Sequence, residues 1–406
     1  MTKLTVVIPA YNEECGIAAI VSRVLAIKEN LEKVNIDGLE LLVVNDGSRD
    51  RTREIVLEIA ASEPCLRVIS HPKNRGYGAA LKTGFAMSQG DLIGFLDADG
   101  TYPPEYFPQL CKAALEGADL VIGSRMMGSD SKMPATRRVG NLFFAGLLSL
   151  LGSKKVTDSA SGMRVFKRSI LGKIFPLPDG LNLTPVMSTR ALHENLKVVE
   201  LPIPYSERVG RSKLSVVKDG KIFLESMIWT VLSYNPVRIF GLIGSLGILL
   251  SAIIGLVLVG VRLSGSTTLG PWGIVGLSTS LVSGVAGISL FTLGVTFNYL
   301  VSLFYETPIR QGLFGRPLLN PPLETHFGWM GLSVLLVGIL VGLITLILGV
   351  NGWDMNRIWM YLLGAAMMIL IGLQLIINWI LVRILGELSK RRESAEHDLH
   401  PAAVQE

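Results

Sequence analysis

Short apolar runs alternate with segments of helical character through the first half of the chain, and each run ends abruptly in polar, turn-forming residues. The apolar runs lie at 4–9, 39–44 and 92–96. The segments of helical character between them lie at 13–29, 52–61 and 77–88. A short apolar run bounded by turn residues is typical of a parallel strand buried on both faces. Strands that alternate with helices form right-handed βαβ units, so the pattern predicts a doubly wound, mostly parallel α/β sheet.

Acidic residues follow all three predicted strands. Glu13 and Tyr11 come after the first run, Asp46 after the second, and Asp97 and Asp99 after the third. In an open α/β sheet, ligands bind at the edge formed by the carboxyl ends of the strands, so we expect these side chains to converge there. Buried carboxylates need a cation to neutralise them. A solvated acidic turn is the alternative for Asp97 and Asp99 alone, but three acidic strand ends favour a site for a divalent cation and a phosphate-bearing substrate.

Five sequence motifs carry a family resemblance. VVIPAYNEE at 6–14, VVNDGSRDRT at 43–52 and DADGTYPPE at 97–105 together resemble a family 2 glycosyltransferase with a GT-A fold. SGMRVF at 161–166 and RVGRSKL at 208–214 resemble the polyprenyl-phosphate branch of that family, the dolichyl-phosphate mannose synthase group. The likeness covers nearly all of residues 3–235.

The resemblance implies a nucleotide-sugar donor and a metal ion, Mg²⁺ or Mn²⁺, held by Asp97 and Asp99, with Ala98 also in the donor site. It implies that the base and ribose are bound by residues at and just after the ends of the first two strands: Pro9, Tyr11, Glu13, Val44 and Asp46. Thr101 stands where relatives commonly have Gln, so we expect no metal contact from its side chain. Asn45 stands where many relatives have a second Asp and receives no acidic role.

The resemblance also assigns polar and basic residues to the phosphates. Arg125 matches a phosphate-binding Arg and joins Asp97 and Asp99 as a catalytic residue, and Arg208 and Lys213 match a basic pair before the membrane. The lipid phosphate is expected to contact a second set: Arg137, Arg138, Asn141 and Ser161. A guanidinium pairs well with phosphate oxygens, although a solvated surface arginine is the alternative for each Arg.

Three further segments have weaker interpretations. Asp158 and Ser161 lie, by their place in the family, on a loop near the sugar with Arg164 behind them. Residues 178–185, which include Asn182, are a candidate for the loop that distinguishes sugars, with an ordinary helix-capping loop as the alternative. Residues 74–81 (NRGYGAAL) begin like a dinucleotide fingerprint but have Leu81 where the third Gly belongs. We expect there only a tight turn that leads into a helix near the nucleotide.

The second half of the chain is strongly apolar. The chain is 49% hydrophobic with a mean hydropathy of +0.46, and the excess lies after residue 235. Four stretches exceed the roughly 20 residues that a membrane-spanning helix needs: 238–261, 274–303, 327–350 and 358–385. Basic residues gather at 304–326 and in the tail, so the positive-inside rule predicts a multi-pass protein of the cell membrane with its N-terminal domain and C-terminus in the cytosol. No signal peptide is expected, because the first apolar run is short and is interrupted by Pro9.

Residues 214–236 join the two halves. Their apolar residues recur at helical spacing, and Lys218, Lys221 and Glu225 share the opposite face. This favours an amphipathic helix in the membrane interface, with a plain connector as the alternative. The expected organisation is a cytosolic GT-A domain (1–213), an interface helix (214–236), a four-helix transmembrane domain (237–388) and a polar cytosolic tail (389–406).

These patterns predict an inverting enzyme that transfers one sugar from a GDP- or UDP-linked donor to a polyprenyl or dolichyl phosphate at the cytosolic membrane face. A processive membrane polysaccharide synthase is one alternative, but such synthases carry a Gln-x-x-Arg-Trp segment that this sequence lacks. A non-catalytic GT-A membrane scaffold is another. The net charge of +5 is concentrated beside the predicted membrane, which fits anionic head groups and excludes nucleic acid as a partner. Three scattered cysteines and isolated histidines indicate neither disulfides nor a metal site.

Overall fold

The computed structural model describes residues 2–128, 133–151, 155–206, 216–266, 270–305, 323–353 and 355–399. The chain separates into two compact units, Met1–Val231 and Leu232–Glu406. The boundary falls inside α9 (Val216–Tyr234), which is the helix expected over 214–236.

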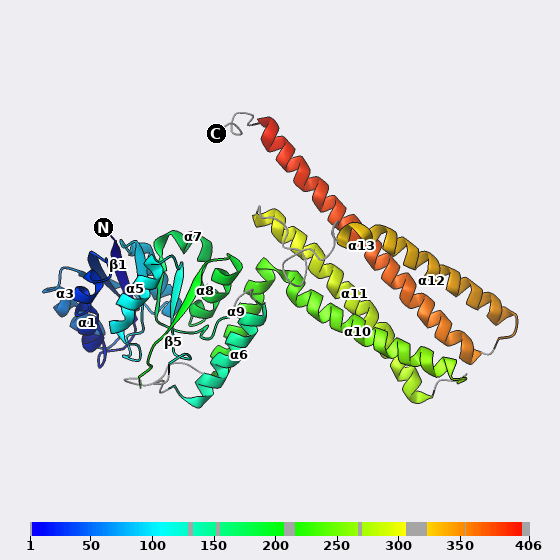
Figure 1. The fold of residues 1–406 in the computed structure, drawn as a ribbon, viewed down its shortest axis with the longest axis horizontal. Helices are drawn as coiled ribbons and strands as arrows, with labels where there is room; N and C mark the ends of the chain where they lie inside the picture. Colours follow the sequence, from blue (N-terminus) through cyan, green and yellow to red (C-terminus); the bar gives the residue numbers. More distant parts are fainter. Residues whose placement is uncertain are drawn as a thin grey trace. The chain divides into compact units, whose positions relative to one another are not determined.

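A seven-stranded sheet lies at the centre of the described N-terminal unit (Figure 1). Its strands are β1 (Lys3–Ala10), β2 (Gly38–Asn45), β3 (Leu66–Ser70), β4 (Leu92–Phe95), β5 (Leu120–Ser124), β6 (Arg164–Lys167) and β7 (Val198–Pro202). They lie in the order β3-β2-β1-β4-β6-β5-β7, and β6 alone runs antiparallel to its neighbours in this sheet. The mostly parallel, doubly wound sheet is therefore confirmed.

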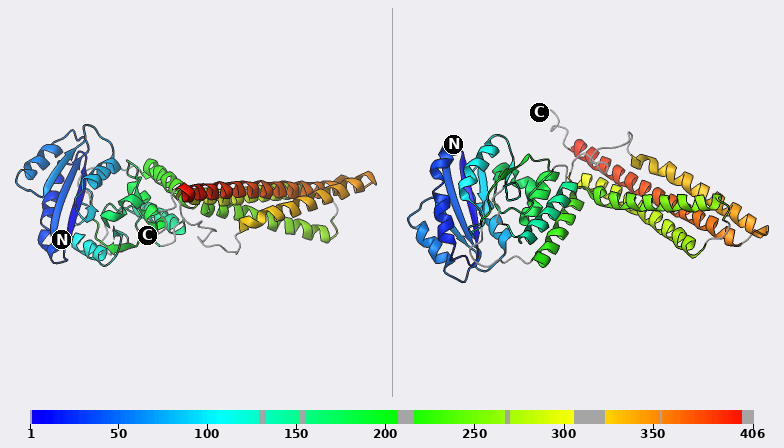
Figure 2. Two further views of the ribbon diagram at one scale, coloured as in Figure 1. Left: turned by 90° about the horizontal axis from the view of Figure 1, so that it is seen from above. Right: turned by 60° about the horizontal axis from the view of Figure 1, so that its bottom comes forward.

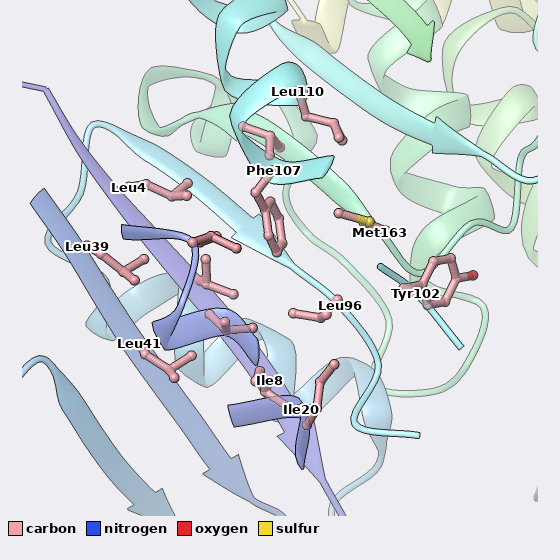
Figure 3. Packing of buried hydrophobic residues seen from close by; sticks show 14 of the residues in the cluster. Leu4, Ile8, Ile20, Leu39, Leu41, Leu96, Tyr102, Phe107, Leu110 and Met163 are labelled. Carbon is pink, nitrogen blue, oxygen red and sulfur yellow. The ribbon is translucent and has the colours of Figure 1, made fainter. Parts of the chain in front are cut away.

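Helices cover both faces of the sheet. On one face, α1 (Ile17–Leu25), α3 (Thr52–Ala60) and α5 (Phe107–Leu115) form one buried cluster with alternate residues of β1. Figure 3 shows part of this core, in which Phe107 of α5 lies between Leu4 and Leu96. On the other face, α4 (Tyr77–Met87) packs against β1 and β2, and α7 (Leu171–Ile174) and α8 (Leu183–His193) belong to the same buried cluster. Because both faces are covered, the central strands are mostly apolar, with the buried pair Thr5 and Glu40 as an exception.

The helices expected over 52–61 and 77–88 correspond to α3 and α4, but the segment expected over 13–29 forms two helices. It divides into α1 and the short α2 (Lys28–Glu32), and both Ile27 and Leu31 are buried in the core around this break. The apolar pattern also gave no indication of β6 and β7, which are only four and five residues long.

α6 (Ala135–Leu151) and α9 pack against each other within the N-terminal unit. The rings of Phe144 and Phe223 lie edge to face with centroids 5.9 Å apart, and Leu148 and Met227 are fully buried beside them. The outer side of α6 instead exposes three apolar side chains: Val139, Leu142 and Phe143. Such a helix contributes one side to the interior of the unit and presents an apolar strip on its other side.

The C-terminal unit contains four described helices that are long and apolar enough to cross a membrane. They are α10 (Pro236–Leu263), α11 (Pro271–Tyr305), α12 (Phe327–Val350) and α13 (Met355–Leu399). The four membrane-spanning stretches expected from hydropathy are thus confirmed as helices. α13 continues through 389–399, a segment interpreted from sequence as a polar tail.

These four helices form two packed pairs, α10 with α11 and α12 with α13 (Figure 2). Glycines permit the close approach of α10 and α11. A Cβ atom at Gly244 of α10 would lie only 2.6 Å from the carbonyl oxygen of Gly287 of α11. Thr296 of α11 donates a hydrogen bond of 3.0 Å to Asn378 of α13. Polar groups within the spans therefore contribute to helix packing.

Candidate active site

One cavity of about 500 Å³ lies in the N-terminal unit at the carboxyl ends of the central strands. Carboxylates that follow three strands line one part of it: Glu13, Asp46, Asp97 and Asp99. Apolar side chains before and on α6 and on α9 line another part: Met133, Phe144 and Phe223. The cavity therefore combines an acidic side, which suits a cation and phosphates, with an apolar side.

Asp99 is held by the turn that follows it. Its side chain is buried, and its Oδ1 accepts hydrogen bonds from the backbone N–H and the hydroxyl of Thr101, at 3.1 and 2.6 Å. The Thr101 hydroxyl is thus used to fix the Asp99 carboxylate.

Asp97 lies between two different elements. The Tyr77 hydroxyl, at the start of α4, donates a hydrogen bond of 2.8 Å to Asp97 Oδ1. On another side, a Cβ atom at Gly162 would lie only 2.6 and 2.8 Å from the two Asp97 carboxylate oxygens. Burial, followed by the charge of Asp97, raises the pKa of Tyr77 well above its usual range, so its hydroxyl keeps its proton.

Asp46 anchors the loop that precedes α4. Its carboxylate accepts hydrogen bonds from the backbone N–H groups of Arg75 and Gly76, at 2.9 and 2.8 Å. His71 Nδ1 lies 2.7 Å from Asp46 Oδ1, and its Nε2 lies 2.9 Å from the Thr83 hydroxyl. Asp46 therefore both lines the cavity and fixes one of its walls.

Arg125 follows β5 and forms a buried ion pair with Asp158. Its Nε and Nη2 donate to the two carboxylate oxygens at 2.8 and 2.7 Å, and its backbone N–H donates to Oδ2 at 3.0 Å. The guanidinium also lies near the rings of Tyr102 and Tyr205, with centroid distances of 5.9 and 5.5 Å. This bidentate pairing fixes the arginine where it lines the cavity.

The ion pair shifts the pKa values of both Asp158 and Arg125. Burial raises the pKa of Asp158, but the neighbouring Arg125 charge more than offsets burial, so the pKa lies below its ordinary value. Burial likewise lowers the pKa of Arg125, and Asp158 reverses this, so the pKa lies well above its ordinary value. Both groups are charged throughout the physiological range.

Arg164, at the start of β6, organises the loop that carries Asp158. Its fully buried guanidinium donates hydrogen bonds to the carbonyl oxygens of Ser161 and Ser159, at 3.0 and 2.8 Å, and to the Ser188 hydroxyl at 2.9 Å. Burial lowers the pKa of Arg164 to about 10, although Asp158 opposes the shift. The side chain thus remains charged at neutral pH and supports the loop from behind.

Comparisons with known proteins match this architecture. A model described as "Glycosyl transferase family 2" matches residues 5–175, and one described as a domain of unknown function (DUF8752) matches 236–396. The chain is 30% identical over 317 residues to an undecaprenyl-phosphate 4-deoxy-4-formamido-L-arabinose transferase of Edwardsiella ictaluri, across 77% of this chain and 92% of the relative. The chain belongs to glycosyltransferase family 2.

Two further relatives of this glycosyltransferase are proteins of Haloferax volcanii. A dolichyl-phosphate hexose transferase is 32% identical over 225 residues, across 55% of this chain and 92% of the relative. A low-salt glycan biosynthesis hexosyltransferase is 30% identical over 403 residues, across 95% of this chain and 89% of the relative. Among solved structures, Mycobacterium tuberculosis glucosyl-3-phosphoglycerate synthase in complex with Mn²⁺, UDP and glucosyl-3-phosphoglycerate has a TM-score of 0.42 and 25% identity, across 57% of this chain and 80% of that chain.

The structure of the glycosyltransferase brings most of the expected site residues together. The following line the cavity: Pro9, Tyr11, Glu13, Asp46, Asp97, Ala98, Asp99, Arg125, Arg137 and Asn141. Arg208 and Lys213 lie outside the described residues.

Three expected residues do not line this cavity. Val44 is fully buried in the core beneath α4, because its side chain points to the helix-covered face of β2. Ser161 is also fully buried, and its hydroxyl donates a hydrogen bond of 2.6 Å to the Gly123 carbonyl oxygen. Arg138 is exposed on α6, one residue beyond the cavity-lining Arg137. These three residues therefore lie outside the cavity lining, and their contact with a ligand stays a prediction.

Several lining residues of this glycosyltransferase were not anticipated. Five unanticipated aromatic side chains contribute to the cavity: Tyr77, Tyr102, Phe144, Phe223 and Tyr205, the last of which lies beside Arg125. Tyr77 lies in a motif that the sequence marked only as a turn leading into a helix. Tyr102 lies in the DADGTYPPE motif, where it was assigned no role, and Phe144, Phe223 and Tyr205 follow no local pattern that distinguishes them from core residues.

The loop at 178–185 contributes to the cavity through Leu181 and Thr184 rather than Asn182. The Asn182 amide instead donates a hydrogen bond of 2.6 Å to the Ser226 hydroxyl on α9. Lys82 of α4 lies 2.6 Å from the Asp179 carboxylate and fixes the other end of the loop. Asn182 therefore connects two elements of the unit, and Leu181 and Thr184 are the members of this loop that face the cavity.

The donor set fits a divalent cation only in part. Among the described residues, no three His, Cys, Asp or Glu side chains form a cluster that could hold a metal ion. Asp97 and Asp99 are two oxygen donors, and Mg²⁺ or Mn²⁺ ordinarily completes such a site with water and substrate phosphates. The residues of this glycosyltransferase therefore fit an ion that binds together with a diphosphate.

Gly162→Ala should lower the rate of sugar transfer by about 10- to 100-fold, because a misplacement of about 1 Å at a catalytic group can have that effect. The added methyl group would overlap the Asp97 carboxylate and displace it. The measurement is kcat of the purified variant. Gly172→Ala is the matched control, since no atom lies within 4 Å of the Cβ it would add. Equal activity of Gly162→Ala and wild type would contradict the assigned position of Asp97.

Proposed function

We propose that the protein transfers a single sugar from a GDP- or UDP-linked donor to a polyprenyl phosphate, with inversion at the sugar carbon. The observation that supports this most directly is the cavity, which joins acidic strand ends to an apolar wall of Met133, Phe144 and Phe223. A nucleotide-sugar alone requires no such wall, whereas a lipid-linked phosphate does. The relatives named for undecaprenyl- and dolichyl-phosphate transfer support the same acceptor class.

The donor lies along the acidic side of the cavity. Tyr11, Glu13 and Asp46 line the part that suits the nucleoside, and Asp97 and Asp99 line the part that suits the diphosphate. The two latter residues would hold Mg²⁺ or Mn²⁺, which as a Lewis acid offsets the charge of the departing diphosphate. Arg125 lies near this part of the cavity, and Asp158 partly compensates its charge. Its guanidinium would therefore mainly orient a bound phosphate through hydrogen bonds.

The reaction needs little acid–base assistance. A lipid phosphate has a second pKa of about 6, so its attacking oxygen is ionised at neutral pH. This oxygen forms a bond to the anomeric carbon on the face opposite the leaving group. The bond from that carbon to the diphosphate breaks, and the nucleoside diphosphate leaves with the electron pair. Arg137 of α6 lines the cavity and is the described cation best placed to bind the acceptor phosphate.

The proposed membrane location follows from α9 and the four apolar helices. α9 ends at Tyr234 and α10 begins at Pro236, so one residue, Asn235, connects α9 to the first span. The basic residues at 304–326 and in the C-terminal segment support a cytosolic location for these parts of the chain and for the N-terminal unit. The amphipathic α9 would lie at the membrane interface.

Membranes that contain the protein should form a sugar-labelled, mild-acid-labile lipid from polyprenyl phosphate and one labelled UDP- or GDP-sugar. Membranes with Asp97→Ala protein are the control and should form none. Label that appears only in a long polymer would favour a processive synthase, and absence of binding by every tested nucleotide-sugar would favour a scaffold. Inside-out vesicles should use added donor, whereas sealed right-side-out vesicles should not.

A further inference from the structure

We propose that Tyr77 is a positioning residue for Asp97, and that the motif at 74–81 serves to place its hydroxyl against this carboxylate. The inference rests on the proposed function, because it concerns how one of the two metal-binding carboxylates is oriented. It also gives a role to a motif that otherwise resembles an incomplete dinucleotide fingerprint.

The first observation is the contact itself. Tyr77 lines the cavity, and its hydroxyl donates a hydrogen bond of 2.8 Å to Asp97 Oδ1. Across the carboxylate, the backbone of Gly162 lies so close that a Cβ atom there would be 2.6 Å from an Asp97 oxygen. A carboxylate held on one side by a donor and confined on another presents a fixed set of oxygens to a metal ion.

The second observation is that the residue before Tyr77 is anchored to the nucleoside side of the cavity. The Gly76 N–H donates a hydrogen bond of 2.8 Å to Asp46, and the Arg75 N–H donates one of 2.9 Å. Gly76 has a φ of +105°, a left-handed conformation that a side chain would disfavour. The backbone that enters α4 is therefore fixed immediately before the tyrosine.

The third observation is the close packing of the first turn of α4 against residues 178–180. The Ala79 N–H donates a hydrogen bond of 3.1 Å to the Asp179 carbonyl oxygen. A Cβ atom at Gly78 would lie 2.2 Å from the Pro178 carbonyl oxygen, so only glycine permits this approach. Anchored from both directions, α4 holds the Tyr77 ring beside Asp97, and the motif links the Asp46 and Asp97 sides of the cavity.

The test compares Mn²⁺ binding by purified full-length wild type and Tyr77→Phe in the presence of UDP or GDP, with free Mn²⁺ measured by electron paramagnetic resonance. Loss of a hydrogen bond to a metal-binding carboxylate is expected to weaken Mn²⁺ binding by about 10- to 100-fold. The temperature of thermal unfolding should stay unchanged. Tyr106→Phe is the matched control, because Tyr106 is a half-buried tyrosine outside the cavity, and it should bind Mn²⁺ like wild type.

The outcomes separate this inference from the proposed function. Wild-type affinity in Tyr77→Phe together with lost affinity in Asp97→Asn would overturn the positioning role and leave the metal site in place. Weakened binding that accompanies a lowered unfolding temperature would show general structural damage and would also overturn it. Wild-type affinity in Asp97→Asn would instead refute the metal site on which the proposed function depends.

Discussion

Replacement of either carboxylate after β4, by Asp97→Ala or Asp99→Asn, should abolish sugar transfer while the N-terminal unit remains folded. Each change removes one of the two protein oxygen donors expected to hold the cation against the donor diphosphate. Loss of about 4 kcal/mol of transition-state stabilisation corresponds to a decrease of about a thousandfold in rate. The measurement is kcat with a labelled nucleotide-sugar and polyprenyl phosphate, together with thermal unfolding.

Asp91→Asn provides the matched control for this prediction. Asp91 precedes the same strand, is exposed, and accepts a hydrogen bond of 3.0 Å from the Lys3 backbone N–H, at the amino end of β4. Its replacement should leave the rate of transfer unchanged. Near-normal turnover in a well-folded Asp97→Ala or Asp99→Asn protein would refute the metal-binding assignment.

The convergence of the acidic strand ends could be predicted from sequence. Glu13, Asp46, Asp97 and Asp99 all line one cavity, as expected from apolar runs that end in acids and from the parallel course of the strands. The prediction succeeded because strand polarity and connection rules determine which edge these residues occupy. No side-chain detail was needed.

The orientation of individual side chains was harder to predict. Val44 was expected near the nucleotide, but both faces of β2 are covered by helices, so Val44 and its neighbour Val43 are equally apolar and equally buried. In such a strand, the alternation that would show which way each residue points is absent. Ser161 was expected in the site because of its motif, yet its hydroxyl donates a hydrogen bond to the Gly123 carbonyl oxygen.

Long-range pairing was also beyond the reach of local patterns. Arg125 was recognised as a functional cation, but its partner Asp158 lies 33 residues away and was assigned to the sugar instead. Tyr102 and Tyr205 flank the same guanidinium from different segments of the chain. A charged residue whose partner comes from tertiary packing cannot be distinguished, in sequence, from one that awaits a ligand.

Asp158→Asn should destabilise the N-terminal unit strongly, because it leaves the Arg125 guanidinium buried without a counter-charge. The side chains of Asp158 and Arg125 are 0% and 10% exposed. Removal of one partner from a buried ion pair typically costs about 3–5 kcal/mol, which lowers the unfolding temperature of a domain of this size on the order of 10 °C. Thermal unfolding of the purified protein at neutral pH measures the effect.

Glu105→Gln is the control for an ordinary surface pair. Glu105 binds Arg23 at 2.8 Å, but the two side chains are 51% and 42% exposed, so water screens their attraction. Its replacement should change stability by less than about 1 kcal/mol. Equal effects of Asp158→Asn and Glu105→Gln would show that the buried pair makes no special contribution.

The pH dependence and a double variant complete the test of the Arg125–Asp158 pair. The pKa of Asp158 lies below its unfolded value of about 3.9, so the pair stabilises the protein fully above that value and is lost as pH falls through the folded pKa. The stability difference between wild type and Asp158→Asn should therefore be constant near neutrality and narrow below about pH 4.

Arg125→Leu combined with Asp158→Leu should recover much of the stability, because neither charge is left unpaired. Under the proposed role of Arg125 beside the diphosphate, transfer activity should not return, and a double variant that regained activity would restrict the pair to a structural role.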